Sequence, residues 1–284
     1  PSRVAAVRVA VTDLAEYARC PRRHHLARVL ALPEPRGVSR APADDPARAT
    51  VRGTLAHAML SETDLGAPPL ERRAQMAAAA ARRGHDPASP GARRILAEIT
   101  RFAESDAGHA LARAAREGRL SRELPFLLRL DGTRGAPDAY LVGAIDALVA
   151  ERRGALTVVD YKYAVARPEA AGRYRLQLLA YALAARRAHP RARVRARLQF
   201  LRGDLRAVDV TPSPDELERF AREAPALAWD AHRGAGGALS PADVGRDEAC
   251  CRAEGCGFVG RCYPARRPAP TPAPAPVVAD PAPA

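Results

Sequence analysis

Apolar residues in the first part of the chain recur every three or four positions, which is the period of an amphipathic helix. Helices are therefore expected at 11–30, 51–62, 70–83 and 92–117. Pro21 is expected to break or kink the first of them. The segment 32–49 is rich in Pro, Ala and Asp and predicts a loop. The two Ala- and Arg-rich helices would form a helical insert that covers about 70–118.

The hydrophobic period shortens near residue 123. Segments rich in Leu, Val, Phe and Tyr predict strands at 123–130, 139–150, 155–164, 193–201 and 205–210. Amphipathic helices are expected at 174–189 and 215–231. A strand meander followed by a helical crossover predicts an α/β fold in which helices flank a mixed central sheet.

The composition adds a strong positive charge. The 284 residues carry a formal net charge of +13, and the pI is near 10.5, which favours an anionic partner such as nucleic acid. No apolar run approaches the ~18 residues of a membrane span. The N-terminus has no apolar stretch of secretory type, so a cytoplasmic protein without a membrane partner is expected. Because the chain begins with Pro1 rather than Met, we interpret it as a piece of a longer protein.

Lys162 is the one lysine among 44 arginines, so its position is informative. In VVDYKYA it follows Asp160 by two residues, and residues two apart on a strand share a face. Asp146, one strand earlier, is expected beside Asp160 across the sheet. Carboxylates at that separation repel each other unless a divalent cation bridges them, and Mg²⁺ prefers such oxygen ligands. The alternative is a structural ion pair on an edge strand.

Three polar side chains lie on otherwise apolar predicted helices. His57 follows Gly53 in GTLAHAML, and His can ligate a metal or contact a phosphate. Gln177 and Tyr181 in YRLQLLAYA are four residues apart and share one helix face. They are candidates for bracing Lys162 or contacting a substrate backbone. Each residue alone also fits an ordinary structural role.

A basic strand is expected near residue 193. Arg191, Arg193, Arg195 and Arg197 alternate with small or apolar residues, which places the arginines on one face. The pattern fits a groove that tracks the phosphates of single-stranded DNA. It fits the solvated outer face of an edge strand equally well, and the sequence leaves both interpretations open.

The chain holds five cysteines: Cys20, Cys250, Cys251, Cys256 and Cys262. An odd number without a secretion signal argues against a disulfide framework. Four of them lie within 13 residues, and the fifth lies more than 200 residues upstream. A local zinc finger would not need so distant a partner.

Five of these motifs together resemble a known family. GTLAHAML, ELPF, GAID, VVDYK and QLLAYA occur in the order typical of the PD-(D/E)XK nuclease superfamily. The chain is most similar to the RecB/AddB-type exonuclease domain at the C-terminus of bacterial helicase–nucleases. The resemblance covers roughly 11–263 and implies a restriction-endonuclease-like fold. It implies a nuclease domain at 1–264 with its core at about 120–232, followed by a Pro/Ala-rich, disordered tail at 265–284.

The resemblance also implies an active site. Carried over by position, His57, Asp146 and Asp160 would hold Mg²⁺ or Mn²⁺, and Lys162 would position or activate the attacking water.

Three further positions complete the implied catalytic set. Gln177 and Tyr181 match the supporting motif of the family. Glu123 lies where the family often has an acidic residue before the first core strand.

The cysteines fit the iron–sulfur subset of the same family. There, one N-terminal Cys and three C-terminal ones hold a 4Fe–4S cluster, which implies Cys20, Cys251, Cys256 and Cys262 as ligands here. The family often has five residues between the second and third of the C-terminal cysteines and two between the first and second. In this chain, four residues separate Cys251 from Cys256, and Cys250 is a rival ligand. Zinc is the alternative metal, because four thiolates also suit it.

The resemblance implies a metal-dependent DNA exonuclease of the bacterial cytoplasm, associated with the nucleoid and acting in double-strand-break repair or recombination. No Walker A motif occurs, so a helicase motor would lie in the same polypeptide or in a partner subunit. Its DNA would be single-stranded or a duplex end. The alternatives are an iron–sulfur nuclease of CRISPR adaptation, a non-catalytic DNA-binding scaffold of the same fold, and a zinc-stapled nucleic-acid-binding protein.

Overall fold

The structure is a computed structural model that describes residues 6–35, 46–132, 135–168, 170–235 and 247–264. The expected tail at 265–284 lies outside the described residues. No helix in the described ranges is long and apolar enough to cross a membrane.

One mixed sheet organises the described residues. Its order is β1-β3-β4-β5-β6, and β2 pairs with β3 off this path. The β1–β3 and β4–β5 pairs are parallel, and the other pairs are antiparallel. The strands are β1 (Ala6–Ala10), β2 (Leu120–Leu130), β3 (Asp138–Ala150), β4 (Ala155–Lys162), β5 (Arg193–Phe200) and β6 (Ala207–Asp209).

The long strand β3 has a gap in its pairing on one edge. Residues 139–149 pair with β2 along one edge, so β1 and β4 must share the other. There β1 pairs with residues 138–142 and β4 with residues 147–150. Residues 143–146 lie between the two partners, where β1 and β4 diverge. Asp146 is the last residue of this gap.

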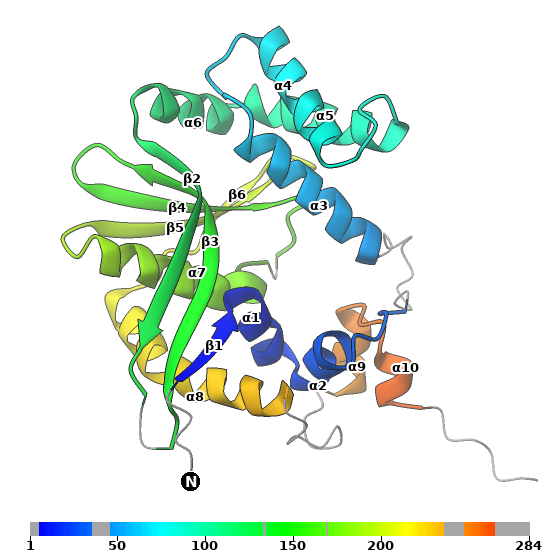
Figure 1. The fold of residues 1–284 in the computed structure, drawn as a ribbon, viewed down its shortest axis with the longest axis vertical. Coiled ribbons are helices and arrows are strands. Elements are labelled where there is room, and N and C mark those ends of the chain that lie inside the picture. The colour runs from blue at the N-terminus through cyan, green and yellow to red at the C-terminus, as the bar shows by residue number, and fades with distance from the viewer. Residues whose placement is uncertain (1–5, 36–45, 133–134, 169, 236–246, 265–284) are drawn as a thin grey trace, which may run out of the picture.

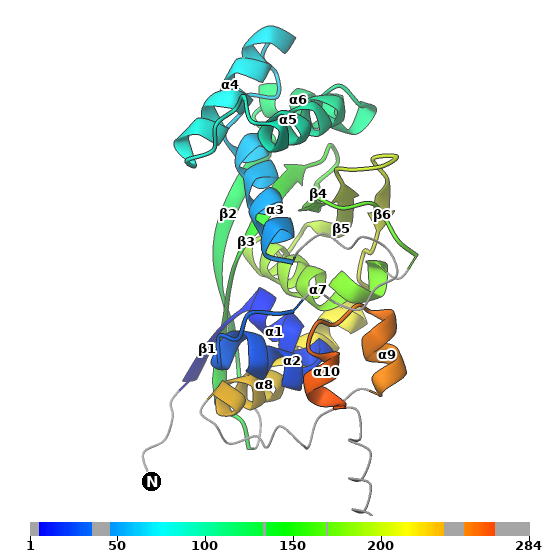
Figure 2. The ribbon, with the colours of Figure 1, turned by 90° about the vertical axis from the view of Figure 1, so that its right-hand side faces the viewer.

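Helices cover both faces of the sheet and build two apolar cores (Figures 1 and 2). The first core joins the strands to α1, α7 and α8. The second joins α3, α4, α5 and α6 to β3, β4 and the residue after β5. The helices are α1 (Val11–Arg19), α2 (Pro21–His24), η1 (His25–Val29), α3 (Pro46–Ser61), α4 (Pro69–Arg82), α5 (Pro90–Ala103), α6 (Asp106–Arg116), α7 (Ala170–Ala188), α8 (Pro214–Ala235), α9 (Glu248–Ala253) and α10 (Val259–Cys262).

The N- and C-terminal segments of the described chain lie together. Both views place α9 and α10 beside α2, although more than 200 residues separate them in sequence (Figures 1 and 2). The sheet stands between this group and the helical insert at the other end of the molecule.

The expected strands and long helices are confirmed within a few residues, and the mixed sheet flanked by helices is the predicted fold class. The helix expected at 11–30 is broken. Cys20 has an extended backbone (φ −160°), and Pro21 begins a new helix, because proline suits the first helical position and not the interior.

Two further elements differ from the expectation. The helix expected at 92–117 is two helices, because Ser105 leaves the helical conformation and its hydroxyl accepts a hydrogen bond from Gly108 N (3.3 Å). The strand β1 was not expected. It is a short parallel strand that leads directly into α1.

Candidate active site

Asp146 lies where β3 separates from β4. The last ladder pair joins Ala147 to Val159, so the next register position sets Asp146 opposite Asp160. Instead of a backbone carbonyl, Asp146 Oδ2 accepts the hydrogen bond from Tyr161 N at 2.7 Å. A side chain thus completes the ladder, and the carboxylate is held at the mouth of the gap.

His57 reaches the same place from α3. Its Nε2 lies 3.0 Å from the Tyr161 carbonyl oxygen, which can only accept, so Nε2 carries the proton of that hydrogen bond. Its Nδ1 then faces Asp146 Oδ1 at 3.5 Å. Burial lowers the pKa of His57, but the hydrogen bond and charge of Asp146 outweigh it and raise the pKa overall. The space between Nδ1 and Oδ1 therefore favours a positive charge, either a proton or a metal ion.

Glu123 joins His57 and Asp146 from β2. Its neighbours on β2 pair with the residues that flank Asp146, which sets Glu123 opposite Asp146. The ligand atoms of His57, Glu123 and Asp146 all lie within 4.8 Å of one another. Burial and the Asp146 charge raise the pKa of Glu123. Its φ of +47° is a conformation that costs an L-residue about 1–2 kcal/mol, and such strain clusters at functional sites.

A second polar group lies on β4 and α7. Lys162 Nζ lies 2.6 Å from Asp160 Oδ2 and donates a hydrogen bond to Gln177 Oε1 at 3.2 Å. Gln177 Nε2 donates to Asp160 Oδ1 at 3.1 Å and to the Tyr181 hydroxyl at 2.8 Å. The ring of Tyr174 lies 4.5 Å from Lys162 Nζ, a cation–π distance. Both N–H bonds and the oxygen of the Gln177 side-chain amide are therefore hydrogen-bonded.

Burial dominates the electrostatics of Asp160. The side chain is 1% exposed, and the contact of its Oδ2 with Lys162 Nζ is an ion pair rather than a hydrogen bond of good geometry. Burial raises the pKa of Asp160 to about 6; Lys162 opposes this shift and Asp146 adds to it. Burial lowers the pKa of Lys162, but Asp160 more than reverses the effect. A divalent cation beside Asp160 and Asp146 would relieve the repulsion between these two carboxylates.

The first residue of the GAID segment, Gly143, has no room for a side chain. A Cβ at this position would lie 2.9 Å from Phe126 Cζ and 3.3 Å from Tyr181 Cε1. The Phe126 and Tyr181 rings meet edge to face there, with centroids 5.6 Å apart. The glycine lets both rings pack over β3, which fixes the helix face that carries Gln177.

The sequence of the chain was compared with known families. The profile of the PD-(D/E)XK nuclease superfamily matches residues 8–263. The chain belongs to the PD-(D/E)XK nuclease superfamily. Its mixed sheet flanked by helices is the restriction-endonuclease-like fold of that superfamily. No curated protein matches the sequence significantly.

Solved structures similar to this superfamily member include SSO0001 and a putative exonuclease from Eubacterium rectale. SSO0001 shares 14% identity with a TM-score of 0.42, over 88% of this chain and 83% of that one. The putative exonuclease shares 11% identity with a TM-score of 0.49, over 86% of each chain. The family assignment rests on the sequence profile.

The fold of this PD-(D/E)XK chain brings the expected site residues into two adjoining groups. The expected metal ligands were His57, Asp146 and Asp160, whereas the closest group of ligand atoms contains Glu123 in place of Asp160. Glu123 lies within β2, three residues after its start, rather than before the first strand. Asp160 as a ligand stays a prediction.

Two groups in the site were not predicted from the sequence. The backbone of Tyr161 binds both His57 and Asp146, and no sequence pattern signals a backbone role. Tyr174 was missed although it lies three residues before Gln177 and so shares its helix face, which is a usable signal.

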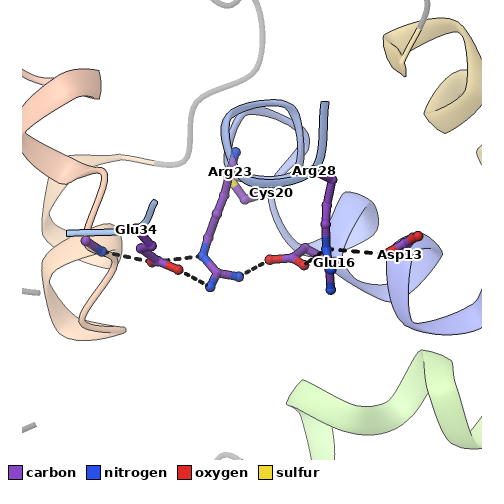
Figure 3. Close-up of polar contacts among 7 residues, drawn as sticks. Asp13, Glu16, Cys20, Arg23, Arg28 and Glu34 are labelled. Carbon is purple, nitrogen blue, oxygen red and sulfur yellow. Dashed lines mark hydrogen bonds and ion pairs between the residues drawn. The ribbon is translucent and has the colours of Figure 1, made fainter. Parts of the chain in front are cut away.

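The cysteines of this superfamily member lie apart from these groups, where α2 meets α9 and α10. Cys20 caps α2, and its Sγ accepts a hydrogen bond from Arg23 N at 3.4 Å. Figure 3 shows the Arg23 side chain between the carboxylates of Glu34 and Glu16. Glu34 Oε1 also accepts a hydrogen bond from Gly257 N at 3.0 Å, which ties the C-terminal segment to the N-terminal one.

All five cysteines are electrostatic neighbours. Burial comes first in raising the pKa of Cys251 to about 11, and Cys256, Cys20, Cys262 and Cys250 add to it. Burial and Cys20 also raise the pKa of Cys262, while a nearby arginine opposes this. Cys20 and Cys251 are buried, whereas Cys250, Cys256 and Cys262 are half-buried. A bound metal would favour the thiolate form of such cysteines.

Proposed function

We propose that the chain is a divalent-metal-dependent deoxyribonuclease domain that hydrolyses phosphodiester bonds. The observation that carries this proposal is the arrangement of Asp160 and Lys162 on one strand, fixed by Gln177, beside the group of His57, Glu123 and Asp146. The alternative, a structural ion pair on an edge strand, does not fit, because β4 lies between β3 and β5 and Asp160 is 1% exposed.

The donor set fits Mg²⁺ or Mn²⁺. Carboxylates and an imidazole gather within 4.8 Å of one another, His57 Nδ1 faces Asp146 Oδ1, and the charge of Asp146 adds to the raised pKa of the buried Asp160. We propose His57, Glu123, Asp146 and Asp160 as the residues that hold it. The ion would polarise the scissile phosphate and lower the pKa of a bound water.

The side chains of the chain supply the rest of the chemistry. Lys162, held by Asp160 and Gln177, carries its charge where negative charge develops on the phosphoryl oxygens, and its free N–H bond can orient the attacking water. Gln177 positions Lys162 and Asp160 through its hydrogen bonds, and the Tyr181 hydroxyl in turn holds Gln177. Recognition through phosphate alone would make cleavage nearly independent of sequence.

The biological setting is a further part of the proposal. The resemblance to helicase–nuclease domains supports an exonuclease in double-strand-break repair or recombination at the nucleoid of a bacterial cytoplasm. The one lysine lies in YKY, so the chain carries no Walker A motif and the motor would be in cis or in a partner subunit. A CRISPR-adaptation nuclease and a non-catalytic scaffold are the competing assignments within the same fold.

We also propose that Cys20, Cys251, Cys256 and Cys262 hold a 4Fe–4S cluster, with zinc as the alternative metal. The electrostatic proximity of the cysteines supports a metal there, and the deeper burial of Cys251 supports it over the half-buried Cys250. Such a cluster would staple the N- and C-terminal segments together.

Cleavage of end-labelled single- and double-stranded DNA tests the proposed reaction. Protein prepared without air is compared in Mg²⁺, Mn²⁺ and EDTA. We expect metal-dependent degradation that falls on the order of 10²–10³-fold in Lys162→Ala and in Asp160→Asn. Asp204→Asn, which removes an exposed carboxylate after β5, is the matched control and should cut normally.

Two outcomes would reject the proposal. Cleavage that survives Lys162→Ala would place the chemistry elsewhere. Wild-type protein that binds DNA but never cuts it, in either metal, would favour the scaffold assignment.

A further inference from the structure

A row of exposed arginines on β5 lies on the sheet face opposite to Asp160 and Lys162 of the candidate active site. Arg197 lies opposite Val159 in the parallel β4–β5 register, whereas Leu198 lies opposite Asp160. Because successive residues on a strand point to opposite faces, the exposed arginines and the catalytic pair are on different sides of the sheet. We call this row the arginine stripe, which consists of Arg193, Arg195 and Arg197.

Two adjoining hollows open along the arginine stripe. One of about 200 Å³ lies between α6 and the strands β3, β4 and β5, and is lined by Arg113 and Arg197 among others. The second, of about 640 Å³, lies at the β3–β4 turn and is lined by Arg153, Arg193 and Arg195 among others. The residues common to both hollows are Arg119 and Glu151.

The two hollows are lined by more arginines than acids. Glu117 is paired with Arg119 and Arg152, and Glu151 accepts a hydrogen bond from the Thr157 hydroxyl at 3.0 Å. Asp209, opposite Arg197 on β6, has its pKa lowered by hydrogen bonds from Thr211 and by the charges of Arg197 and Arg195. The arginines that make no ion pair with any residue in the described ranges are Arg113, Arg153, Arg193, Arg195 and Arg197. An anionic ligand would complement this surface.

The β3–β4 turn holds an arginine in a strained conformation. Arg153 has a φ of +75° and is followed by Gly154 at +76°. Hairpin turns of this kind favour Asn or Gly at the first position, because an L-side chain there costs about 1–2 kcal/mol. The Arg153 side chain lines the larger hollow, so the turn presents a further guanidinium group there.

We propose that the arginine stripe and its two hollows bind the sugar–phosphate backbone of single-stranded DNA, away from the cleavage centre. Alternate residues of a strand lie about 6.6 Å apart, so the stripe presents evenly spaced guanidinium groups to a linear polyanion. Arginine binds phosphate through paired N–H bonds. No aromatic residue in the described part of the chain lines either hollow, so we expect binding without base stacking and independent of sequence.

This surface would tether a strand while its end is cut on the other face. Holding DNA at a second place raises its local concentration at the active site without a change in the chemistry. The inference rests on the proposed function only in taking DNA as the polyanion, because binding at the stripe needs neither metal nor Lys162.

The test is the salt dependence of binding to labelled oligothymidine in EDTA, where no cleavage occurs. Each phosphate neutralised on a single strand contributes about 0.7 to the slope of log Kobs against log salt. We expect Arg195→Ser with Arg197→Ser to make the slope shallower by about 1.4. Arg219→Ser with Arg222→Ser, on the exposed side of α8, removes the same charge elsewhere and should leave the slope nearly unchanged.

Equal slopes in the two double variants would overturn the assignment of the arginine stripe. Competition by polyglutamate as effective as that by oligothymidine of equal charge would also overturn it, in favour of an acidic protein partner. A chain that binds in this way but never cuts DNA would keep this inference and reject the proposed nuclease, so the two failures are distinguishable.

Discussion

Lys162, Asp160 and Asp146 form a buried group of charges that needs its hydrogen bonds. Burying ions is unfavourable unless their remaining polar atoms find partners. Gln177 provides two of these, since its amide oxygen accepts from Lys162 and its amide nitrogen donates to Asp160. The amide can do both in one orientation only. Gln177 therefore fixes the ammonium relative to the carboxylate.

We expect Gln177→Met, which keeps the volume but loses both hydrogen bonds, to lower cleavage about 10–100-fold, the usual effect of losing a supporting partner at a metal site. Tyr181→Phe removes only a hydroxyl that contacts Gln177 and should lower it less than tenfold. Initial rates at saturating DNA measure both. A loss in Tyr181→Phe as large as that in Gln177→Met would contradict this division of roles.

Metal binding is expected to weaken as the pH falls through about 6. The pKa of Asp160 is raised to about 6, and the pKa values of His57 and Glu123 are raised as well. The metal-free folded chain thus keeps a proton on Asp160 that the unfolded chain releases above pH ~4, so this group's contribution to stability falls as the pH rises from ~4 to ~6. A metal ion displaces that proton.

Thermal unfolding with and without Mn²⁺ measures this linkage. The increase in Tm on adding Mn²⁺ should be larger at neutral pH than at pH values below 6. An equal increase at both pH values would show that these groups do not bind the ion.

Strand alternation alone was enough to place Asp160 and Lys162 together and Asp146 beside them. The structure has that arrangement, while the catalytic roles stay predictions. The position of Glu123 could not be read from the sequence, because it depends on a positive φ that hydrophobic periodicity does not encode. The side-chain pairing of Asp146 with Tyr161 N follows from the divergence of two strands, which is a property of the whole sheet.

At the scale of elements, α9 and α10 depend on a close contact with the segment after η1. Gly257 lies against this segment so tightly that a Cβ would fall 1.9 Å from the Pro35 carbonyl oxygen and 2.8 Å from Glu34 Cγ. Nothing lies within 4 Å of a Cβ added at Gly260, in α10. Gly257 and Gly260 therefore provide a test substitution and its control in the same segment.

Gly257→Ala is expected to dislodge the C-terminal segment, at a typical overpacking cost of 1–3 kcal/mol. Gly260→Ala should be neutral or stabilising, because alanine favours a helix. Hydrogen exchange of residues 247–264 reports the difference. Equal protection in the two variants would show that this contact does not hold the segment.

The spacing of apolar residues predicted most helices and strands, and each exception has a local cause. The break at Ser105 had a signal, since Ser followed by Asp suits a helix N-terminus, but the uninterrupted apolar period of 92–117 outweighed it. The strand β1 had five residues and lay next to a stronger helical pattern. Five residues are too few for a clear alternating pattern, and the strand conformation is stabilised by pairing with β3.

At the scale of the molecule, residues from the two ends of the described chain converge on one site. Arg23 holds Glu34, which accepts a hydrogen bond from Gly257 N in the C-terminal segment. Cys20 is close enough to Cys262 to raise the pKa of that thiol. Contacts between segments so distant in sequence are entropically unfavourable to form. A metal bound by thiolates from both segments would stabilise the closed form alone.

Replacing Cys251 should therefore have a larger effect than replacing Cys250. We expect Cys251→Ser to lose bound iron and to lower Tm by several degrees, and Cys250→Ser to keep both near their wild-type values. Iron and zinc analysis of anaerobically purified protein, with visible absorbance and thermal unfolding, measures this. Retention of iron in Cys251→Ser together with its loss in Cys250→Ser would reverse the ligand assignment.

The most direct test of the central claim is a Mn²⁺ titration that follows metal binding by electron paramagnetic resonance and DNA cleavage in the same samples. The account predicts that cleavage rises in parallel with occupancy in the wild type. Asp146→Asn should weaken both together by 10-fold or more, as expected for a metal ligand or its close partner, while Asp204→Asn changes neither. Cleavage without Mn²⁺ or Mg²⁺, or unchanged Mn²⁺ affinity in Asp146→Asn, would contradict it.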